Sequence, residues 1–82
     1  MKTKLRKIPS VGPRTEQDLI GLGYTTIESL KGQNPEDMYE KDCLRKGYQV
    51  DRCQLYVYRL AVYFSENETH DPEKLKWWNW KD

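Results

Sequence analysis

The sequence predicts an all-α fold, a single compact domain over residues 1–82 built as a bundle of about five short helices. Three observations predict it. Helix start signals recur along the chain, one long segment repeats its apolar residues with the 3.6-residue period of a helix, and no segment alternates as a strand would. The 82 residues suffice for one domain, and a hydrophobic fraction of 37% restricts that domain to a small core.

The first two helices are expected on either side of a turn. Leu5 and Ile8 are expected to form the apolar side of a short helix that Pro9 ends, because proline lacks the amide hydrogen that a helix needs. Gly12 and the proline after it mark a tight turn, with that proline at the first position of the next helix. This second helix is expected over residues 13–22, with Gly23 as its left-handed cap.

Two capping signals define the middle of the chain. Thr25 and Glu28 have the spacing of a capping box, which predicts a short helix through Leu30. Asn34 is followed by a proline and two acids, the residues typical of a helix start. A further helix is therefore expected from there to about Lys46.

The longest helix is expected after Asp51, a suitable N-cap, and it carries an amphipathic stripe. The members of this stripe are Cys53, Val57, Leu60, Ala61 and Phe64. Asp71 begins a last short helix in the Trp-rich segment 71–82. We expect this segment to pack on the rest of the domain, because so small a chain cannot leave three tryptophans in solvent.

A second stripe of the longest helix alternates basic and aromatic residues. Its members are Arg52, Tyr56, Arg59 and Tyr63. Such residues can hold a single nucleic-acid strand by stacking and cation–π contact. The interpretation that we favour is that the tryptophans cover these tyrosines; exposed tryptophans would instead indicate a protein-interaction surface.

One pattern lies across the turn between the first two helices: Leu5-x-x-Ile8-Pro9-Ser10-Val11-Gly12, then Leu19, then Leu22 to Leu30. It resembles the helix-hairpin-helix motif. The hairpin needs a residue tolerant of unusual backbone angles, a role we assign to Gly12, and an apolar residue between the helices, here Val11. The free N–H groups that begin the second helix can then hold a phosphate. The resemblance implies docking on a DNA backbone without reading the bases.

Two positions depart from the motif. Ser10 stands where the family usually has glycine, and serine resists a positive φ. Glu16 stands where the family usually has a small residue at a close contact between helices. Its side chain is expected either to loosen the packing or to turn to solvent, where an acid close to the hairpin would repel phosphate.

A second, degenerate hairpin is a hypothesis. Leu44 to Asp51 aligns with Leu5 to Gly12, and the two runs share leucine, arginine, lysine and valine. A real repeat would place two pseudo-symmetric hairpins in one domain of SAM-like helix-hairpin-helix architecture, and chance is the other explanation. Charge follows the same division: residues 1–14 carry five basic residues and no acid, and residues 43–63 carry four against one. Basic surfaces of this kind are typical of phosphate binding, although charge also fluctuates over short windows.

The residue types and motifs that the sequence contains exclude several other classes of protein. Cys43 and Cys53 form no disulfide framework or CxxC pair, and with His70 they lack any recognised spacing of metal ligands. No nucleophile has a base at a recognised spacing, and no phosphate-binding P-loop is present. We therefore expect no enzyme activity, cofactor, metal or small-molecule substrate. No membrane span and no signal segment is seen, so the cytoplasm is the expected compartment.

Asp51 to Tyr56 and the Trp-rich end make the whole chain similar to a small bacterial family known as the pathogenicity-locus family. That likeness supports the fold and leaves the function open. We expect a non-enzymatic domain that binds DNA or another nucleic acid weakly and without sequence preference. The residues expected at the interface are Lys7, Ser10, Val11, Gly12, Arg14, Thr15, Lys46 and Arg52. The alternative is a protein–protein interaction module that uses the hairpin fold as a scaffold.

Overall fold

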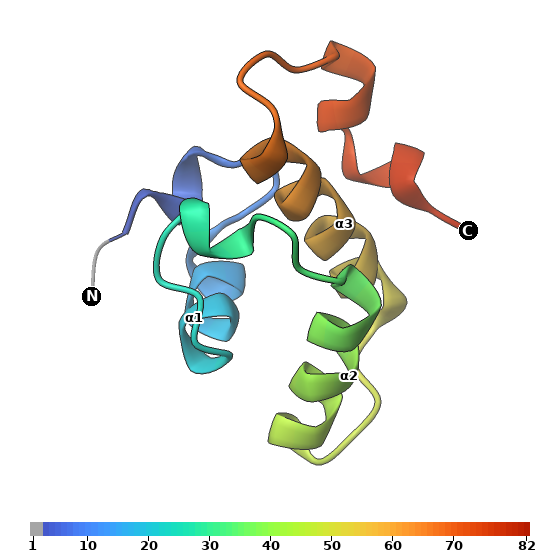
Figure 1. Ribbon diagram of the computed structural model, residues 1–82. Helices are drawn as coiled ribbons and strands as arrows, with labels where there is room; N and C mark the ends of the chain where they lie inside the picture. Colours follow the sequence, from blue (N-terminus) through green and yellow to red (C-terminus); the bar gives the residue numbers. More distant parts are fainter. Residues whose placement is uncertain (1–2) are drawn as a thin grey trace.

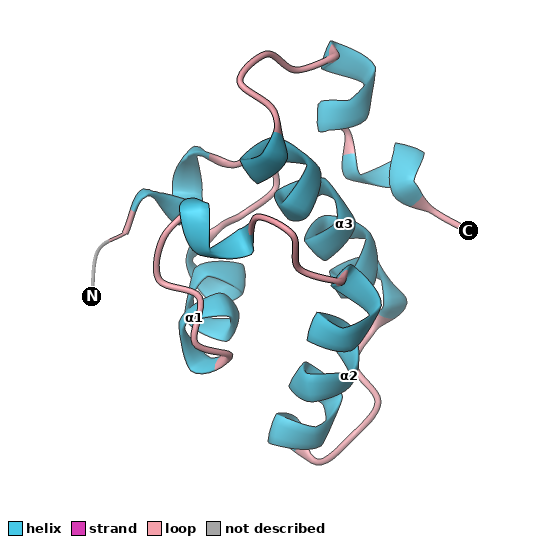
Figure 2. Ribbon diagram, viewed as in Figure 1, coloured by secondary structure: helices cyan, strands magenta, loops and turns pink. Residues whose placement is uncertain are grey.

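The computed structural model describes residues 3–82, in which all regular structure is helical and no strand occurs (Figure 1 and Figure 2). The α-helices are α1 Pro13–Gly21, α2 Pro35–Lys46 and α3 Arg52–Glu66. Four 3-10 helices of about one turn complete the chain: η1 Lys4–Lys7, η2 Glu28–Leu30, η3 Pro72–Leu75 and η4 Trp77–Trp80. The all-α prediction is confirmed. The short helices expected at both ends and around Glu28 are 3-10 turns, because three or four residues cannot repay the cost of nucleating an α-helix.

The capping residues fix the ends of α2 and α3 as expected. The side chain of Asn34 accepts hydrogen bonds from the N–H groups of Glu36 at 2.9 Å and Asp37 at 3.4 Å. Gly47 ends α2 with a φ of 77°, the left-handed conformation that glycine adopts without strain. Asp51 caps α3 by accepting from the N–H of Cys53 at 2.9 Å. These local signals are strong because each one satisfies a backbone group that the helix itself leaves unpaired.

The expected capping box before η2 is displaced by one residue. The reciprocal pair is formed by Thr26 and Ser29, not by Thr25 and Glu28: the N–H of Ser29 donates to Thr26 Oγ1 at 3.1 Å, and the N–H of Thr26 donates to Ser29 Oγ at 3.4 Å. Serine at the third position does what glutamate does in the usual box. The prediction for Thr25 and Glu28 was therefore wrong.

The longest helix, α3, lies at the centre of the molecule and packs against α2, η2, η3 and η4 (Figure 1). It is buried on more than one side, which is typical of a central helix. One hydrophobic core joins it to the N-terminal half. The buried apolar residues of this core are Leu5, Ile8, Val11, Leu19, Leu30, Met38, Tyr39, Val50, Leu55, Val57, Tyr58, Leu60, Ala61 and Val62. The radius of gyration of 11.7 Å matches that of a compact domain of this length.

The amphipathic stripe predicted on α3 is correct in its middle and wrong at its start. Val57, Leu60 and Ala61 are buried, and Phe64 packs partly against the core. Cys53, in contrast, is exposed, because the first turn of α3 extends beyond the core. Leu55 is the buried residue nearest to the start of the helix, followed by Val57 and Tyr58.

The C-terminal segment folds back along α3. Trp77 and Trp80 are half-buried and pack against the core, and the Trp80 ring lies 5.5 Å from the ring of Tyr63. Trp78 remains 51% exposed. Tyr56 has the guanidinium groups of two arginines over its ring, described below, in place of a tryptophan. No helix within residues 3–82 is long and apolar enough to cross a membrane.

Candidate nucleic-acid interface

The turn that precedes α1 runs from Ile8 to Val11 and places a serine in a left-handed conformation. The N–H of Val11 donates to the carbonyl of Ile8 at 3.1 Å, so Pro9 and Ser10 are the two central residues of the turn. Ser10 has a φ of 72°, while Gly12 is extended with a φ of −94°. A type II turn with proline second requires a positive φ at the third residue. The unusual backbone angle assigned to Gly12 therefore belongs to Ser10, and that prediction is corrected.

Val11 and Gly12, the apolar residue and the glycine of the predicted turn, hold the start of α1 in place. Val11 is buried in the core, 5% exposed, and so fixes the end of the turn. Gly12 is the N-cap of α1, and Pro13 occupies the first helical position. A Cβ atom built on Gly12 would meet nothing within 4 Å. The backbone at Gly12 is thus open to solvent on the side where a side chain would lie.

The N-terminus of α1 has no capping side chain. Gly12 offers none, and the N–H of Glu16 already donates to the carbonyl of Gly12 at 2.9 Å. Within residues 3–82, the N–H groups of Arg14 and Thr15 have no hydrogen-bond acceptor. Both are unpaired donors at the positive end of a helix dipole, the arrangement that attracts an anion.

Glu16, expected either to loosen the packing or to turn to solvent, does not turn to solvent: it is buried and only 2% exposed. Its carboxylate accepts from the hydroxyl of Thr3 at 2.7 Å, from the N–H of Thr3 at 3.3 Å and from Arg6 Nε at 3.1 Å. The Thr3 hydroxyl lowers the pKa of Glu16, burial opposes it, and Arg6 lowers the pKa further. The acid of the first turn is therefore paired on the side of η1, and the expected repulsion of phosphate is offset by Arg6.

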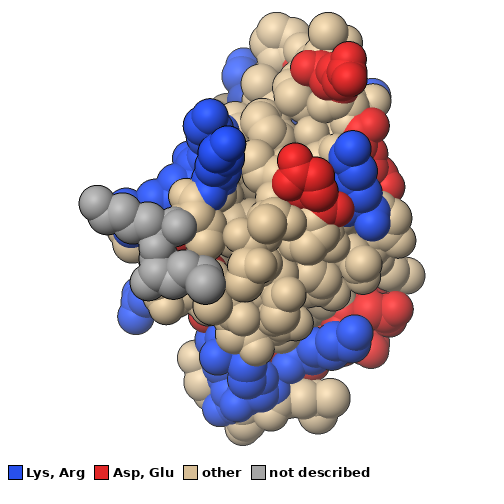
Figure 3. All heavy atoms as spheres, turned by 60° about the vertical axis from the view of Figure 1, so that its left-hand side comes forward, with Lys and Arg blue, Asp and Glu red and all other residues tan. Residues whose placement is uncertain are grey.

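Lys7, Ser10 and Arg14 are exposed around this helix start, and Thr15 is partly exposed. In the part of the chain that the structure describes, neither Lys7 nor Arg14 forms an ion pair, which leaves both positive charges available. Figure 3 looks at this side of the molecule, where Lys and Arg atoms gather in one group at the upper left and another at the lower end. Of the basic residues expected from residues 1–14, Lys4, Arg6, Lys7 and Arg14 lie at the surface, and Lys2 lies outside the described residues.

The connection between α2 and α3 matches the first turn in where the flanking helices end and begin. It differs in that the helix after it is capped by a side chain. The offset of the suspected repeat places η1 on the last turn of α2, and the start of α1 on the start of α3. Val11 and Val50 are both buried at equivalent positions. The start of α3 is nevertheless capped by the carboxylate of Asp51, which already occupies the place of an anion.

Lys46 and Arg52, also expected at the interface, are both paired with acids. Lys46 Nζ lies 3.1 Å from Asp18 and 3.3 Å from Asp42. Burial by itself would lower the pKa of Lys46, but the hydrogen bonds and charges of these two acids outweigh it and raise the pKa. Arg52 is bonded to Asp82. The sequence placed these cations in a basic block. Asp42 is only four residues before Lys46 on the same helix, but Asp18 and Asp82 lie too far along the chain to be recognised as partners from the sequence.

A cavity of about 580 Å³ separates the starts of α1 and α3. It is lined by Arg14, Thr15, Asp18, Lys46, Tyr48, Val50, Asp51, Cys53 and Gln54. The structure therefore brings three of the predicted residues, Arg14, Thr15 and Lys46, to one hollow, and it adds Asp18 and Gln54, which the sequence did not indicate. Gln54 Nε2 donates to Asp18 Oδ2 at 2.8 Å, so these two side chains join α1 to α3.

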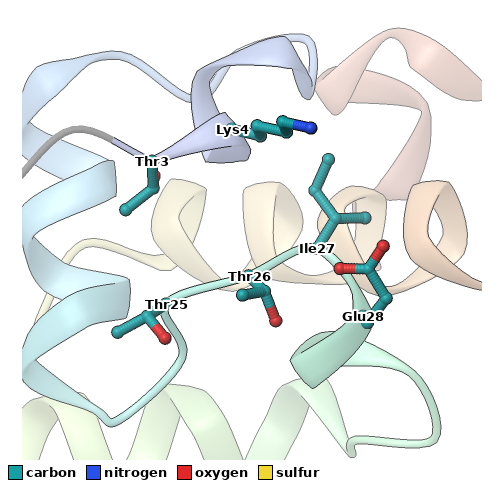
Figure 4. A pocket seen from close by; sticks show the side chains of 6 residues that line it. All are labelled: Thr3, Lys4, Thr25, Thr26, Ile27 and Glu28. Atoms are coloured by element: carbon teal, nitrogen blue, oxygen red, sulfur yellow. The ribbon is translucent and has the colours of Figure 1, made fainter.

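A separate cavity of about 510 Å³ lies between the start of η1 and the loop before η2 (Figure 4). Three threonines, Lys4, Ile27 and Glu28 line it, and none of the predicted interface residues does. No group of three or more potential metal-ligating side chains occurs within residues 3–82. The start of α1 is therefore the site that best combines unpaired donors with positive charge.

No curated protein and no solved structure matches the chain. The family model described as Cdd1, pathogenicity locus, matches residues 1–82, the whole of the sequence. With all of the chain covered, the protein belongs to the Cdd1 pathogenicity-locus family.

Proposed function

We propose that this protein binds nucleic acid, in the first place DNA, by holding backbone phosphates at the start of α1 without reading the bases. The observation that carries the proposal is the uncapped N-terminus of α1, where the N–H groups of Arg14 and Thr15 and two neighbouring cations have no partner among residues 3–82. Phosphate contacts from backbone amides and basic side chains position a protein on DNA but carry no sequence information. Binding of this kind is weak and non-enzymatic.

Each residue of the first turn has a role in this proposal. The amides of Arg14 and Thr15 donate to one phosphate, and the exposed hydroxyl of Ser10 is a further donor. Lys7 and the Arg14 side chain supply charge to the same strand. Val11 fixes the turn from inside the core, and Gly12 provides no side-chain acceptor that would cap the helix in place of the phosphate. The turn is then used as in the helix-hairpin-helix motif that it resembles.

The second connection contributes less in this proposal than the sequence led us to expect. Lys46 and Arg52 are held by acids, and Asp51 caps the helix that would receive a second phosphate. The salt dependence of DNA binding distinguishes contact by two cations from contact by four. Two cations give a slope of about −1.8 in log K against log salt for duplex DNA, whereas four give about −3.6.

The proposal predicts that two substitutions at Gly12 differ in their effect on DNA binding. Gly12→Asp adds a carboxylate that caps α1 and takes the place of the phosphate, so we expect loss of DNA binding with a stability gain of a few tenths of a kcal/mol. Gly12→Ala fits the open space and adds no acceptor, so it should bind as the unchanged protein does. Amide shifts in an NMR titration with short duplex DNA, at roughly 50 and 200 mM salt, measure both. Equal binding by the two variants, or no shift at Arg14 and Thr15 in the unchanged protein, would exclude the α1 site.

A protein–protein interaction module remains the second candidate, and one observation favours it. In the described part of the chain, residues 3–82, three large apolar side chains are exposed: Leu44 by 82%, Tyr48 by 62% and Trp78 by 51%. Leu44 and Tyr48 lie close together in sequence at the end of α2. An association through these residues would change little with salt, whereas phosphate binding weakens steeply. The salt series of the same titration therefore separates the two candidates.

A further inference from the structure

The face of α3 that carries Arg52 and Arg59 is closed by an acid from the C-terminal segment. Arg52 Nη2 is bonded to one oxygen of Asp82, and Arg59 Nη2 donates to the other at 2.8 Å. Both arginines also lie over the ring of Tyr56, with guanidinium carbons 6.0 and 5.7 Å from its centroid. Two guanidinium groups that share one aromatic ring thus converge on a single carboxylate.

This geometry is that of an anion site. A carboxylate offers two oxygens to the two guanidinium groups, and a phosphodiester has two non-bridging oxygens in the same relation. The ring of Tyr56 holds the two side chains at a fixed spacing by cation–π contact. The arginines are therefore positioned before any external ligand arrives.

The side chain of Asp82 is held less firmly than the C-terminal segment to which it belongs. Its side chain is 53% exposed, and in residues 3–82 its only side-chain partners are these two arginines. The segment itself is anchored two residues earlier: Arg59 Nη1 donates to the carbonyl of Trp80 at 2.7 Å, and the Trp80 ring packs on Tyr63. Exposed ion pairs contribute little net stability, so the carboxylate can leave while the tryptophans stay in place.

We propose that Arg52 and Arg59 form a second nucleic-acid phosphate site, which Asp82 occupies as a competitor built into the chain. Release of Asp82 leaves Arg52 unpaired and frees one N–H of Arg59 Nη2, while the other donors of Arg59 still serve Glu36 and Trp80. The ligand is a phosphodiester strand, because the residues that precede and follow Arg52 in the sequence lie beside the first site. Asp51 and Cys53, on either side of Arg52, line the same cavity as Arg14 and Thr15. This inference rests on the proposed function, which supplies the strand.

Asp82→Asn tests the proposal, with Glu68→Gln as the control. Both variants remove one negative charge, but Glu68 lies past the end of α3, roughly 20 Å from Arg52 by helix length. With short oligothymidylate at about 50 mM salt, Asp82→Asn should bind roughly threefold to tenfold more tightly than the unchanged protein, and Glu68→Gln should bind nearly as the unchanged protein does. Adding Arg52→Gln to Asp82→Asn should abolish the gain. Equal gains from Asp82→Asn and Glu68→Gln, or a gain that survives loss of Arg52, would overturn the proposal.

A second readout separates this proposal from the first one. The combined variant Gly12→Asp with Asp82→Asn has the α1 site blocked and the α3 site open. On adding oligothymidylate, the side-chain Nε signals of Arg52 and Arg59 should shift in this variant while the amides of Arg14 and Thr15 do not. Failure of the α1 site alone leaves this result unchanged. Silent arginine signals in the combined variant contradict the α3 site, whatever the α1 amides do in the unchanged protein.

Discussion

Ser10 is the residue at which this chain departs most clearly from ideal backbone geometry. Its φ of 72° is left-handed, which costs an L residue about 1–2 kcal/mol, and no hydrogen bond of its hydroxyl is seen within residues 3–82 to offset that cost. The turn tolerates the strain because its two ends are fixed: Ile8 and Val11 are buried on either side of it. Glycine at this position would remove the strain without changing the turn.

Ser10→Gly is therefore predicted to stabilise the protein. Relief of the left-handed strain exceeds the extra chain entropy that glycine adds to the unfolded state, so the net gain should be about 0.5–1 kcal/mol. Urea unfolding measures it as a higher midpoint with an unchanged slope. Ser10→Ala keeps the strain and serves as the control, with no gain expected. A glycine variant no more stable than the alanine variant would mean that Ser10 is not strained.

The sequence contained only part of the information needed to locate this strain. Proline at the second position is common in type I and type II turns, and only type II demands a positive φ at the next residue, which is Ser10. We assigned the unusual angle to Gly12 because glycine is the residue that most often accepts it. The turn type is the stronger rule, since Gly12 serves as an extended N-cap that many other residues could adopt.

At the scale of elements, one buried carboxylate joins η1 to α1. Glu16 comes from α1 and accepts from Thr3, the N-cap of η1, and from Arg6 within η1. The Thr3 hydroxyl also accepts from the N–H of Leu5 at 3.1 Å, so the same group caps η1 and binds Glu16. The ion pair of Glu16 therefore fixes the first turn against the helix that carries the proposed phosphate site.

This contact predicts a pH dependence of stability. The pKa of Glu16 is lowered in the folded protein, mainly by the Thr3 hydroxyl, from an ordinary value of 4.5. A lowered pKa means that the contribution is fully present above about 4.5 and is lost as pH falls through the folded pKa. Carboxyl NMR signals of Glu16 should titrate below 4.5, and the amides of η1 should change with the same midpoint. Glu16→Gln should remove that transition from the η1 amides; its persistence would assign the transition to another group.

Element boundaries were predictable where a side chain caps the helix, and helix type was not. Asn34, Gly47 and Asp51 each satisfy a backbone group at a helix end, so their identity fixes the position of that end. Whether three or four residues form an α-helical or a 3-10 turn depends on tertiary packing, which a local pattern does not contain. For the same reason the exchange of Thr25 and Glu28 for Thr26 and Ser29 could not be decided from spacing, since both pairs fit it.

At the scale of the whole molecule, the candidate site shows where sequence reasoning ends. The basic residues could be counted, and Lys7 and Arg14 are exposed at the surface. The pairing of Lys46 with Asp18 and of Arg52 with Asp82 depends on how the chain folds over α3. A block of basic residues in the sequence therefore shows how many cations there are, but not how many of them a ligand can reach. Only the cations that a ligand reaches set the salt dependence of its binding.

The three α-helices are joined by one buried network centred on Asp42. This residue of α2 is fully buried, and it pairs with Arg45 at 3.2 Å and Lys46 at 3.3 Å and accepts from the Tyr58 hydroxyl at 3.1 Å. Burial, followed by the charge of Asp42, raises the pKa of Tyr58 well above its ordinary value, so the hydroxyl stays protonated and donates. The same two cations reach Asp18 on α1.

Replacement of Asp42 should therefore destabilise the whole domain and not one helix. Asp42→Asn keeps the shape of the side chain but removes the buried charge that two cations face, at a cost of about 2–4 kcal/mol. Tyr58→Phe removes one donor and should cost about 1–2 kcal/mol. The double variant should cost less than the sum of the two, because both remove the same hydrogen bond. Urea unfolding followed at separate tryptophan and amide probes should give one shared, lowered midpoint in each variant. If only the α2 amides lose protection while the tryptophan midpoint stays, Asp42 stabilises its own helix alone and the three helices are held together by the apolar core.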